Sequence, residues 1–447
     1  MSRPRRLTRR RAMQVATAGA ALPLVHIRSA GAAGRLSIGL WDHWVPGGTE
    51  KMRQQIQAWA DKNKVDVTAD FITSQGNKLL LTAAAEAQAR AGHDVLPFFQ
   101  WDAFNYAADL EPVDDVIQNL VAEYGRYDPM VEYLVKPKDH WVAVPGTDPT
   151  ANLTCCARIS LLKKYAGIDI QAMYPAEPRA SPEAAKWTYD AFLHAAEACA
   201  KAGYPFGMGL GSTGDSINTI AAIFRAFGAE LVNAKGEVTV DSDNVRRVLE
   251  YGQKFVKFLP TDTISYDDAS NNRALISGHS AMIWNPPSAW AVAKRDAPEI
   301  AADCWTFPCP AGPAGRFIPY VYMFYGLWRF GQNKTAAKEL LTYLMQRKQI
   351  EEREIVTEGF NLPPQISMSD FKVWAEVQPP KGTMFNYPIR PWHDSQPSVA
   401  SFPSPPEFAI PMTSRATIPG MWARLYSGQS PEQVIAWAKD EIAGFMR

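Results

Sequence analysis

Two clusters of aromatic and polar residues stand directly after segments that are typical of buried strands. They are Trp41-Asp42-His43-Trp44 and Gln100-Trp101-Asp102. Aromatic faces pack against the apolar face of a sugar ring, and buried amide and carboxylate groups select for its hydroxyls. The pattern therefore predicts a binding site for a polyhydroxylated solute, with Trp41, Asp42, Trp44, Gln100, Trp101 and Asp102 as its candidate residues.

Two other motifs would indicate enzymes instead. Gly209-Leu210-Gly211-Ser212-Thr213-Gly214 has the glycine spacing of a dinucleotide site, between an expected strand and an expected helix. Against that interpretation, the motif lies in the middle of the chain. Gly278-His279-Ser280-Ala281-Met282 is close to a nucleophile elbow, but methionine replaces the last glycine and the strand is expected after the serine.

Neither the paired carboxylates nor the histidines have the spacing of catalytic or metal-binding groups. Asp114-Asp115 and Asp267-Asp268 are adjacent in sequence, so neither pair can flank a glycosidic bond, and we interpret them as solvated or helix-capping residues. The seven histidines lack a metal-binding spacing. We therefore expect a binding protein with no catalytic residue, metal or cofactor. An exported oxidoreductase that uses the motif at Gly209 is the alternative from another class.

The elements that position these residues alternate between strand-like and helix-like segments, which predicts an α/β layer fold. Residues 363–419 are rich in proline, and we expect them to be irregular. Strands are expected at 36–40, 65–72, 94–99, 155–159, 205–210 and 280–284. Helices are expected at 49–63, 77–91, 160–167, 188–203, 215–227, 241–259 and 335–348 and after Ser430, with Thr188, Asp241 and Ser430 as N-caps.

Residues 1–33 have the three parts of an export signal: a run of arginines, a short apolar segment (12–24) and a small-residue end at Ala30-Gly31-Ala32. Thr8-Arg9-Arg10-Arg11 resembles a twin-arginine signal, although Ala12 stands where that signal usually has phenylalanine. An ordinary secretory signal is the alternative. Either route predicts a periplasmic protein, away from most ATP-dependent and NAD-dependent chemistry.

The charge and the apolar runs of the chain argue against a nucleic-acid-binding protein and against a membrane-spanning protein. The 447 residues have a formal charge of zero, but residues 1–32 hold seven arginines and no acid. The remainder carries 39 basic and 46 acidic residues, a net charge of about −7, which argues against nucleic acid as a partner. After the signal no apolar run approaches the roughly 18 residues of a membrane helix, so we expect a protein that does not span the membrane.

Five cysteines are present: Cys155, Cys156, Cys199, Cys304 and Cys309. The odd number and the spacing do not suggest a disulfide framework. Buried free thiols are the preferred interpretation. A disulfide between Cys304 and Cys309 is the alternative.

Six short sequence segments resemble segments of the periplasmic solute-binding proteins of ABC importers and follow one another in the same order. The resemblance is to the large sugar-binding group that includes maltose-binding protein (extracellular solute-binding protein family 1). The resemblance covers nearly the whole chain after the signal. One departure is Leu153-Thr154-Cys155-Cys156-Ala157, where the group usually has an aromatic residue and an amide. The six segments are Ala91–Val95, Ala108–Asp114, Trp141–Pro145, Lys186–Phe192, Ile276–Met282 and Gly359–Pro364.

The resemblance implies a two-lobe periplasmic-binding-protein fold with a cleft between the lobes and hinge crossings, working with membrane permease subunits. We expect a monomer with lobe 1 at 34–150 plus 284–325 and lobe 2 at 151–283 plus 326–447. It also implies that lobe 2 and the third crossing contribute ligand contacts. These are Ser212, Thr213, Asp215, Trp284 and Asn285, with Tyr325, Asn361 and Trp392 as further candidates and Trp290 as a packing residue.

The candidate site residues also allow solutes other than a neutral sugar. A glycerol phosphodiester would require an arginine cluster or a helix N-terminus, and the candidate loops have few arginines. A polyamine would require carboxylates around aromatic rings, which Asp42, Asp102 and Asp215 would supply. Carbohydrate remains the preferred class.

Overall fold

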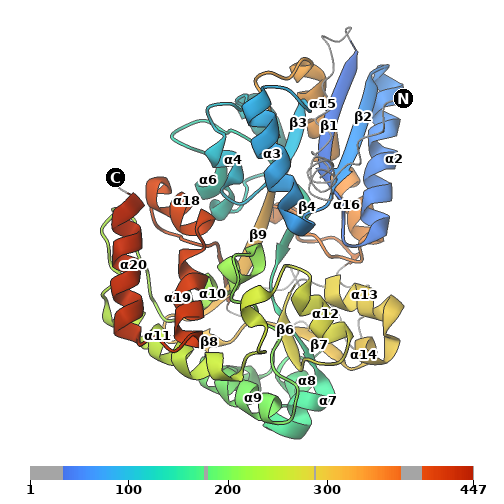
Figure 1. Cartoon of the computed structure of the whole chain (residues 1–447). Helices are drawn as coiled ribbons and strands as arrows, with labels where there is room; N and C mark the ends of the chain where they lie inside the picture. Colours follow the sequence, from blue (N-terminus) through green and yellow to red (C-terminus); the bar gives the residue numbers. More distant parts are fainter. Residues whose placement is uncertain (1–33, 176–179, 286–287, 374–394, 446–447) are drawn as a thin grey trace, which may run out of the picture.

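The computed structural model describes residues 34–175, 180–285, 288–373 and 395–445. The expected export signal and Trp392 lie outside these residues. Helices and strands form two α/β lobes, and two long strands run from one to the other (Figure 1). This confirms the predicted fold class.

The first lobe is built on a mostly parallel sheet. β1 (Arg35–Trp41) pairs in parallel with β2 (Asp66–Ile72) on one side and with β3 (Val95–Phe99) on the other. β1 after Arg35 and nearly all of β3 are buried, because helices cover both faces of such a sheet. Among these helices, α2 (Pro46–Asn63) buries Met52, Ile56 and Trp59 at helical spacing.

The second lobe contains a small antiparallel sheet, in which β5 (Cys155–Arg158) lies between β6 (Met282–Trp284) and β7 (Cys304–Phe307). The helices α9 (Tyr189–Lys201), α10 (Gly214–Ala226) and α11 (Asp243–Phe255) belong to this lobe. The three C-terminal helices, drawn in red in Figure 1, are α18 (Pro406–Ser414), α19 (Thr417–Tyr426) and α20 (Pro431–Phe445). α19 packs on α10 and α11, α20 packs on α11, and α18 packs on α19 and α20.

The lobes are joined by β4 (Val144–Asn152) and β9 (Gly315–Leu327). The two strands pair antiparallel at both ends of β4, with an irregularity between Gly146 and Ala151. β9 also pairs with β3 in the first lobe, and its beginning pairs with β8 (Ala311–Gly312) and β10 (Ser395–Ser398). Because both strands pass from lobe to lobe, side chains near their middle lie at the hinge.

Packing divides the chain differently from the expected lobe boundaries. β6 and β7 pair with β5, so the described residues from 284 to 307 (284–285 and 288–307) belong to the second lobe rather than the first. α15 (Lys334–Leu344) and α16 (Arg347–Val356) pack on α2, which places them in the first lobe rather than the second. Which lobe a segment belongs to is determined by strand pairing and helix packing between residues far apart in the sequence. Short sequence motifs do not encode these contacts. We therefore propose that the first lobe is formed by residues before the middle of β4 and from the middle of β9 to 373.

Most elements begin and end near the expected residues. Thr188 caps α9 and Ser430 caps α20 in a reciprocal arrangement with Gln433. Three expectations are wrong. Residues 205–210 form no strand, α11 is capped by Ser242 rather than Asp241, and the expected irregular segment includes α18 and the start of α19.

The remaining helices have at most 12 residues each. They are α3 (Lys78–Ala89), α4 (Asp102–Asn105), α5 (Asp114–Tyr124), α6 (Pro129–Val135), α7 (Ile159–Leu161), α8 (Ile170–Met173), α12 (Ser270–Ile276), α13 (Ser288–Asp296) and α14 (Pro298–Ala302).

No helix among the described residues is long and apolar enough to cross a membrane.

All five cysteines are free and buried, as expected. Burial raises the pKa of the Cys199 thiol to about 12, which keeps it in the unreactive protonated form. Ellman's reagent should therefore detect five thiols in denaturant and almost none in the folded protein, even after exposure to an oxidising compartment. Three thiols in denaturant would instead indicate a disulfide such as Cys304–Cys309.

Candidate functional site

A cavity of about 400 Å³ lies between the two lobes. The first lobe contributes the loop after β1 and the end of β3, the second lobe contributes the N-terminus of α10, and the hinge strands contribute Pro149 and Val321. Its size is within the range of small-molecule sites. Eight of the residues expected at the site line this cavity: Trp41, Trp44, Gln100, Trp101, Asp102, Ser212, Asp215 and Asn285.

Three expected residues lie elsewhere. Asp42 is exposed and accepts a hydrogen bond from Thr49. Thr213 is the N-cap of α10, where its hydroxyl accepts the amide of residue 216. Trp284 is 1% exposed and packs on Phe192 in the core of the second lobe, and it does not line the cavity.

The end of β3 holds Gln100, Trp101 and Asp102 in place. Gln100 has a left-handed φ of 46°, a strained conformation for a residue with a side chain. Its amide Nε2 donates to the Asn218 Oδ1 at 3.0 Å and to the carbonyl oxygen of Tyr320 at 2.6 Å, which fixes the turn. Trp101 is 2% exposed, so only a small part of its ring faces the cavity. Burial raises the pKa of the Asp102 carboxyl to about 7.

Asp215 and Asp268 form a pair of carboxylates at the N-terminus of α10. Asp215 donates its amide to Asp268 Oδ1 at 3.3 Å. Its own Oδ2 accepts from Asn271 at 2.8 Å and from Asn285 at 3.4 Å. The positive end of the α10 dipole stabilises negative charge there. Burial nevertheless raises the pKa of both carboxyls, and the charge of Asp268 raises that of Asp215 further.

The aromatic walls differ in how much ring surface they offer. Trp41 is 4% exposed, stacks on Phe360 with ring centroids 6.3 Å apart, and donates its Nε1 to Ser74 at 3.3 Å. Trp44 is only half-buried. Trp44 therefore presents the larger aromatic surface to a ligand.

Sequence reasoning missed several lining residues. Asp268 was interpreted as solvated or capping, and it does cap the amide of residue 215, but it also lines the cavity. Asn218 and Asn272 lie on helices, one turn or more from any predicted strand end, and Phe360 comes from a distant loop. Leu80 also lines the cavity and is 46% exposed, an apolar surface that becomes visible only in the structure.

Two of the further candidates have structural roles. Tyr325 is 1% exposed in β9 and Asn361 is fully buried, and neither lines the cavity. Trp290 packs in the core of the second lobe, as expected. Asn361 instead belongs to a polar chain behind the cavity, in which it accepts from His43 at 3.0 Å and donates to Asp148 at 2.9 Å.

That polar chain ends on a buried ion pair. Arg353 is fully buried, and its Nε lies 2.7 Å from the Asp148 Oδ2. The guanidinium also donates to Gln55 and to the carbonyl oxygen of Leu344. Asp148 is in β4, next to Pro149 of the cavity wall, so the ion pair ties the hinge strand to α16 and α2.

The two enzyme motifs have structural explanations. A side chain at Gly211 would approach the carbonyl oxygens of Ile264 and Tyr266 at 2.9 and 3.0 Å, so other backbone occupies the place where a phosphate would lie. Ser280 is 1% exposed, and its hydroxyl is fully engaged with the backbone of residues 207 and 282. The oxidoreductase alternative is not favoured. Among the described residues, no group of three metal-binding side chains is found.

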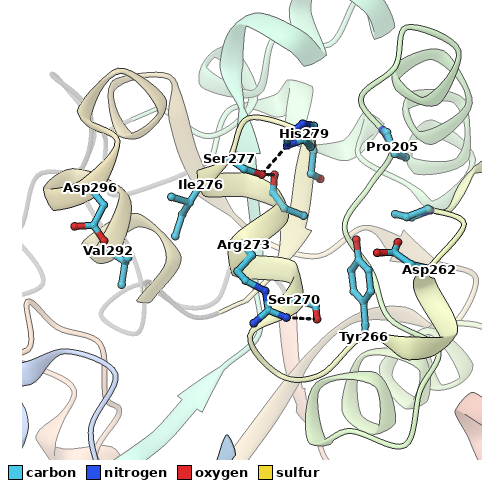
Figure 2. A pocket seen from close by; sticks show the side chains of 13 residues that line it. Pro205, Asp262, Tyr266, Ser270, Arg273, Ile276, Ser277, His279, Val292 and Asp296 are labelled. Atoms are coloured by element: carbon cyan, nitrogen blue, oxygen red, sulfur yellow. Dashed lines mark hydrogen bonds between the residues drawn. The ribbon is translucent and has the colours of Figure 1, made fainter.

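A second hollow of about 720 Å³ lies on the second lobe, away from the hinge (Figure 2). It is open to solvent, and most of its polar side chains already have partners. Arg273 donates to Ser270 and Asp267, and His279 is bonded to Ser277. The interlobe cavity is therefore the stronger candidate, although it is smaller.

Comparisons with known proteins agree with this geometry. Residues 46–351 match the family of bacterial extracellular solute-binding proteins. A comparison with curated protein sequences finds no significant match. The fold is similar to the maltose-bound MalE3 of T. maritima, with 17% identity, a TM-score of 0.71 and coverage of 92% of this chain and 99% of that chain.

Two further solved structures are similar. The Thermotoga lettingae solute-binding protein bound with α-D-tagatose has 18% identity, a TM-score of 0.70 and coverage of 93% of this chain and 100% of that chain. The GacH receptor of Streptomyces glaucescens, solved unliganded and with acarbose, has 19% identity, a TM-score of 0.67 and coverage of 93% and 99%. At these identities the structures show the shared fold. The family match spans more than half of the sequence, and the chain therefore belongs to the bacterial extracellular solute-binding proteins.

Proposed function

We propose that this protein captures a carbohydrate between its two lobes and delivers it to the permease subunits of an ABC importer. The observation that carries the proposal is the interlobe cavity, in which Trp41 and Trp44 lie with amide and carboxylate groups on both sides of the hinge. Aromatic faces and buried polar groups are the two components that sugar recognition requires. Similar folds bound to maltose and to tagatose support the solute class.

The family places the protein outside the cytoplasm. We propose the periplasm as its compartment, reached through the signal at 1–33 by the twin-arginine route, and a monomer as its functional state. Lobe closure around the solute would create the surface that the permease recognises, since hinge closure is a common switching mode. β4 and β9 are the strands about which such closure would occur.

A thermal shift assay on a carbohydrate panel tests the proposal. A solute that binds only the folded protein stabilises it by about 2.7 kcal/mol at 100 times its Kd, which raises the melting temperature by a few degrees. We expect at least one carbohydrate to produce such a shift. No shift with any carbohydrate would contradict the proposal.

Trp44→Ala is the matched variant for this assay. Trp44 is half-buried, so the variant should fold with nearly the same melting temperature, while loss of its aromatic surface should weaken binding at least tenfold. Trp437→Ala serves as a control, because Trp437 is also partly buried but lies on α20, which contributes no residue to the cavity lining. An equal ligand-induced shift in Trp44→Ala and the unaltered protein would contradict this role.

A further inference from the structure

The interlobe cavity has an excess of negative and hydrogen-bond-accepting groups. Asp102, Asp215 and Asp268 all line it, and none of its described lining residues is lysine, arginine or histidine. No described cation forms an ion pair with any of the three carboxylates, in contrast to the buried Asp148, which pairs with Arg353. Buried charges are normally paired, so a cation is expected to complete this set.

Two unpartnered amide oxygens of residues that line the same cavity also favour a ligand that donates hydrogen bonds. Gln100 and Asn272 are each 9% exposed and line the cavity. Their oxygens, Oε1 and Oδ1, have no hydrogen-bond partner among the described residues. Each of these acceptors requires a donor, and an ammonium group offers three donors and no acceptor. A ligand rich in donors therefore fits better than one rich in acceptors.

The N-terminus of α10 disfavours an anionic group of the solute, because its amides already have partners. The amide of residue 216 is already bonded to Thr213, and the amide of Asp215 is bonded to Asp268. The donors that would hold a phosphate or carboxylate are thus engaged, and two carboxylates stand beside them.

Few charged groups face Asp215 from the segments that pack against it. Asp268 lies in the loop before α12 and contributes negative charge, and Asn271 on α12 and Asn285 after β6 are neutral. Asp267 carries its own partner, Arg273, and faces solvent. The pKa of Asp215 is raised by burial and by Asp268, so a cation placed between the two carboxyls would lower both values and displace protons.

We propose that the solute is a carbohydrate that carries a protonated amine, an amino sugar or an amino polyol, and that the amine binds between Asp215 and Asp268. This inference rests on the proposed function. A simple polyamine fits less well, because it has no hydroxyl to match the hydroxyl of Ser212 and no sugar ring to pack on Trp44.

Isothermal titration calorimetry of the purified full chain tests this inference. Glucosamine, galactosamine and the chitosan disaccharide are compared with their N-acetylated counterparts and with glucose, at pH 6.0 and pH 7.0 in two buffers of different ionisation enthalpy. We expect one amine form to bind at least tenfold more tightly than its N-acetylated counterpart. Binding should release protons, and it should tighten from pH 6.0 to pH 7.0 because the carboxylates must lose protons while the amine stays charged.

Asp215→Asn should weaken binding of the amine at least tenfold and reduce the proton release. Asp262→Asn removes the same charge from an exposed site on the second lobe and should leave both quantities unchanged. Equal binding of amine and N-acetylated forms without proton release would overturn the inference while leaving the proposed function in place. Binding of spermidine but of no sugar would overturn both.

Discussion

Asp102→Asn should make the empty protein more stable at pH 7. Asp102 lines the cavity without a cation partner, and burial raises the pKa of its carboxyl from 3.8 to about 7. The folded protein therefore holds a proton between pH 4 and pH 7 that the unfolded chain has released, so its free energy of unfolding falls as the pH rises through this window. Asparagine has no charge to bury, and we expect a gain of about 1–3 kcal/mol at pH 7.

Urea unfolding followed by circular dichroism at pH 5 and pH 7 measures this effect. The gain should be larger at pH 7 than at pH 5, and Asp262→Asn, at an exposed position, should change stability by less than about 0.5 kcal/mol. Binding of the solute should become weaker in Asp102→Asn, because the variant removes a carboxylate from the cavity lining. A variant that is less stable than the unaltered protein at pH 7 would show that the carboxylate is satisfied by the fold.

Arg353→Met should destabilise the protein by about 3–5 kcal/mol. Arg353 is fully buried, with Asp148 at 2.7 Å, and Asp148 is 5% exposed in the hinge strand β4. Removing the guanidinium leaves that carboxylate buried with only the Asn361 amide as a donor, together with an unpaired Gln55 oxygen. Methionine has a similar length, so the loss arises from charge and hydrogen bonds rather than from a large cavity.

Lys348→Met on the same helix is the control, because the Lys348 side chain is 80% exposed and lies 4.0 Å from its acidic partner. Surface pairs of this kind contribute little, so the control should stay within about 0.5 kcal/mol of the unaltered protein. Denaturant unfolding at pH 7 compares the two variants. A loss below about 1 kcal/mol for Arg353→Met would contradict the inferred role of the ion pair.

Local signals in the sequence were sufficient for most helices and strands of this fold. Thr188 and Ser430 mark helix starts because a hydroxyl and its amide partner are close in sequence, and the structure confirms both caps. Residues 205–210 have the composition of a strand, yet they form none: the amide of residue 207 bonds to the carbonyl oxygen of residue 282 at the start of β6, and the amide of residue 210 bonds to that of residue 263 outside the sheet. Neighbours that are distant in sequence override the local preference there.

The candidate site was predicted where it depends on strand ends and missed where it depends on packing. Trp44, Gln100 and Asp102 follow strands of one sheet, and such ends converge on one edge. Asp268 and Asn272 reach the cavity only because α12 packs beside the N-terminus of α10, through Asp215 and Asn271. The lobe membership of α15 and α16 is also set by packing on α2, which no single phrase of the sequence encodes.

A crystal structure of the protein with a solute that passes the thermal shift assay tests the central claim most directly. The account predicts density for one solute between the lobes, in contact with Trp44, Gln100 and Asp215, with an amine of the solute between the carboxyls of Asp215 and Asp268. Density in the open hollow of the second lobe that contains Arg273 and His279, with the interlobe cavity empty, would contradict it.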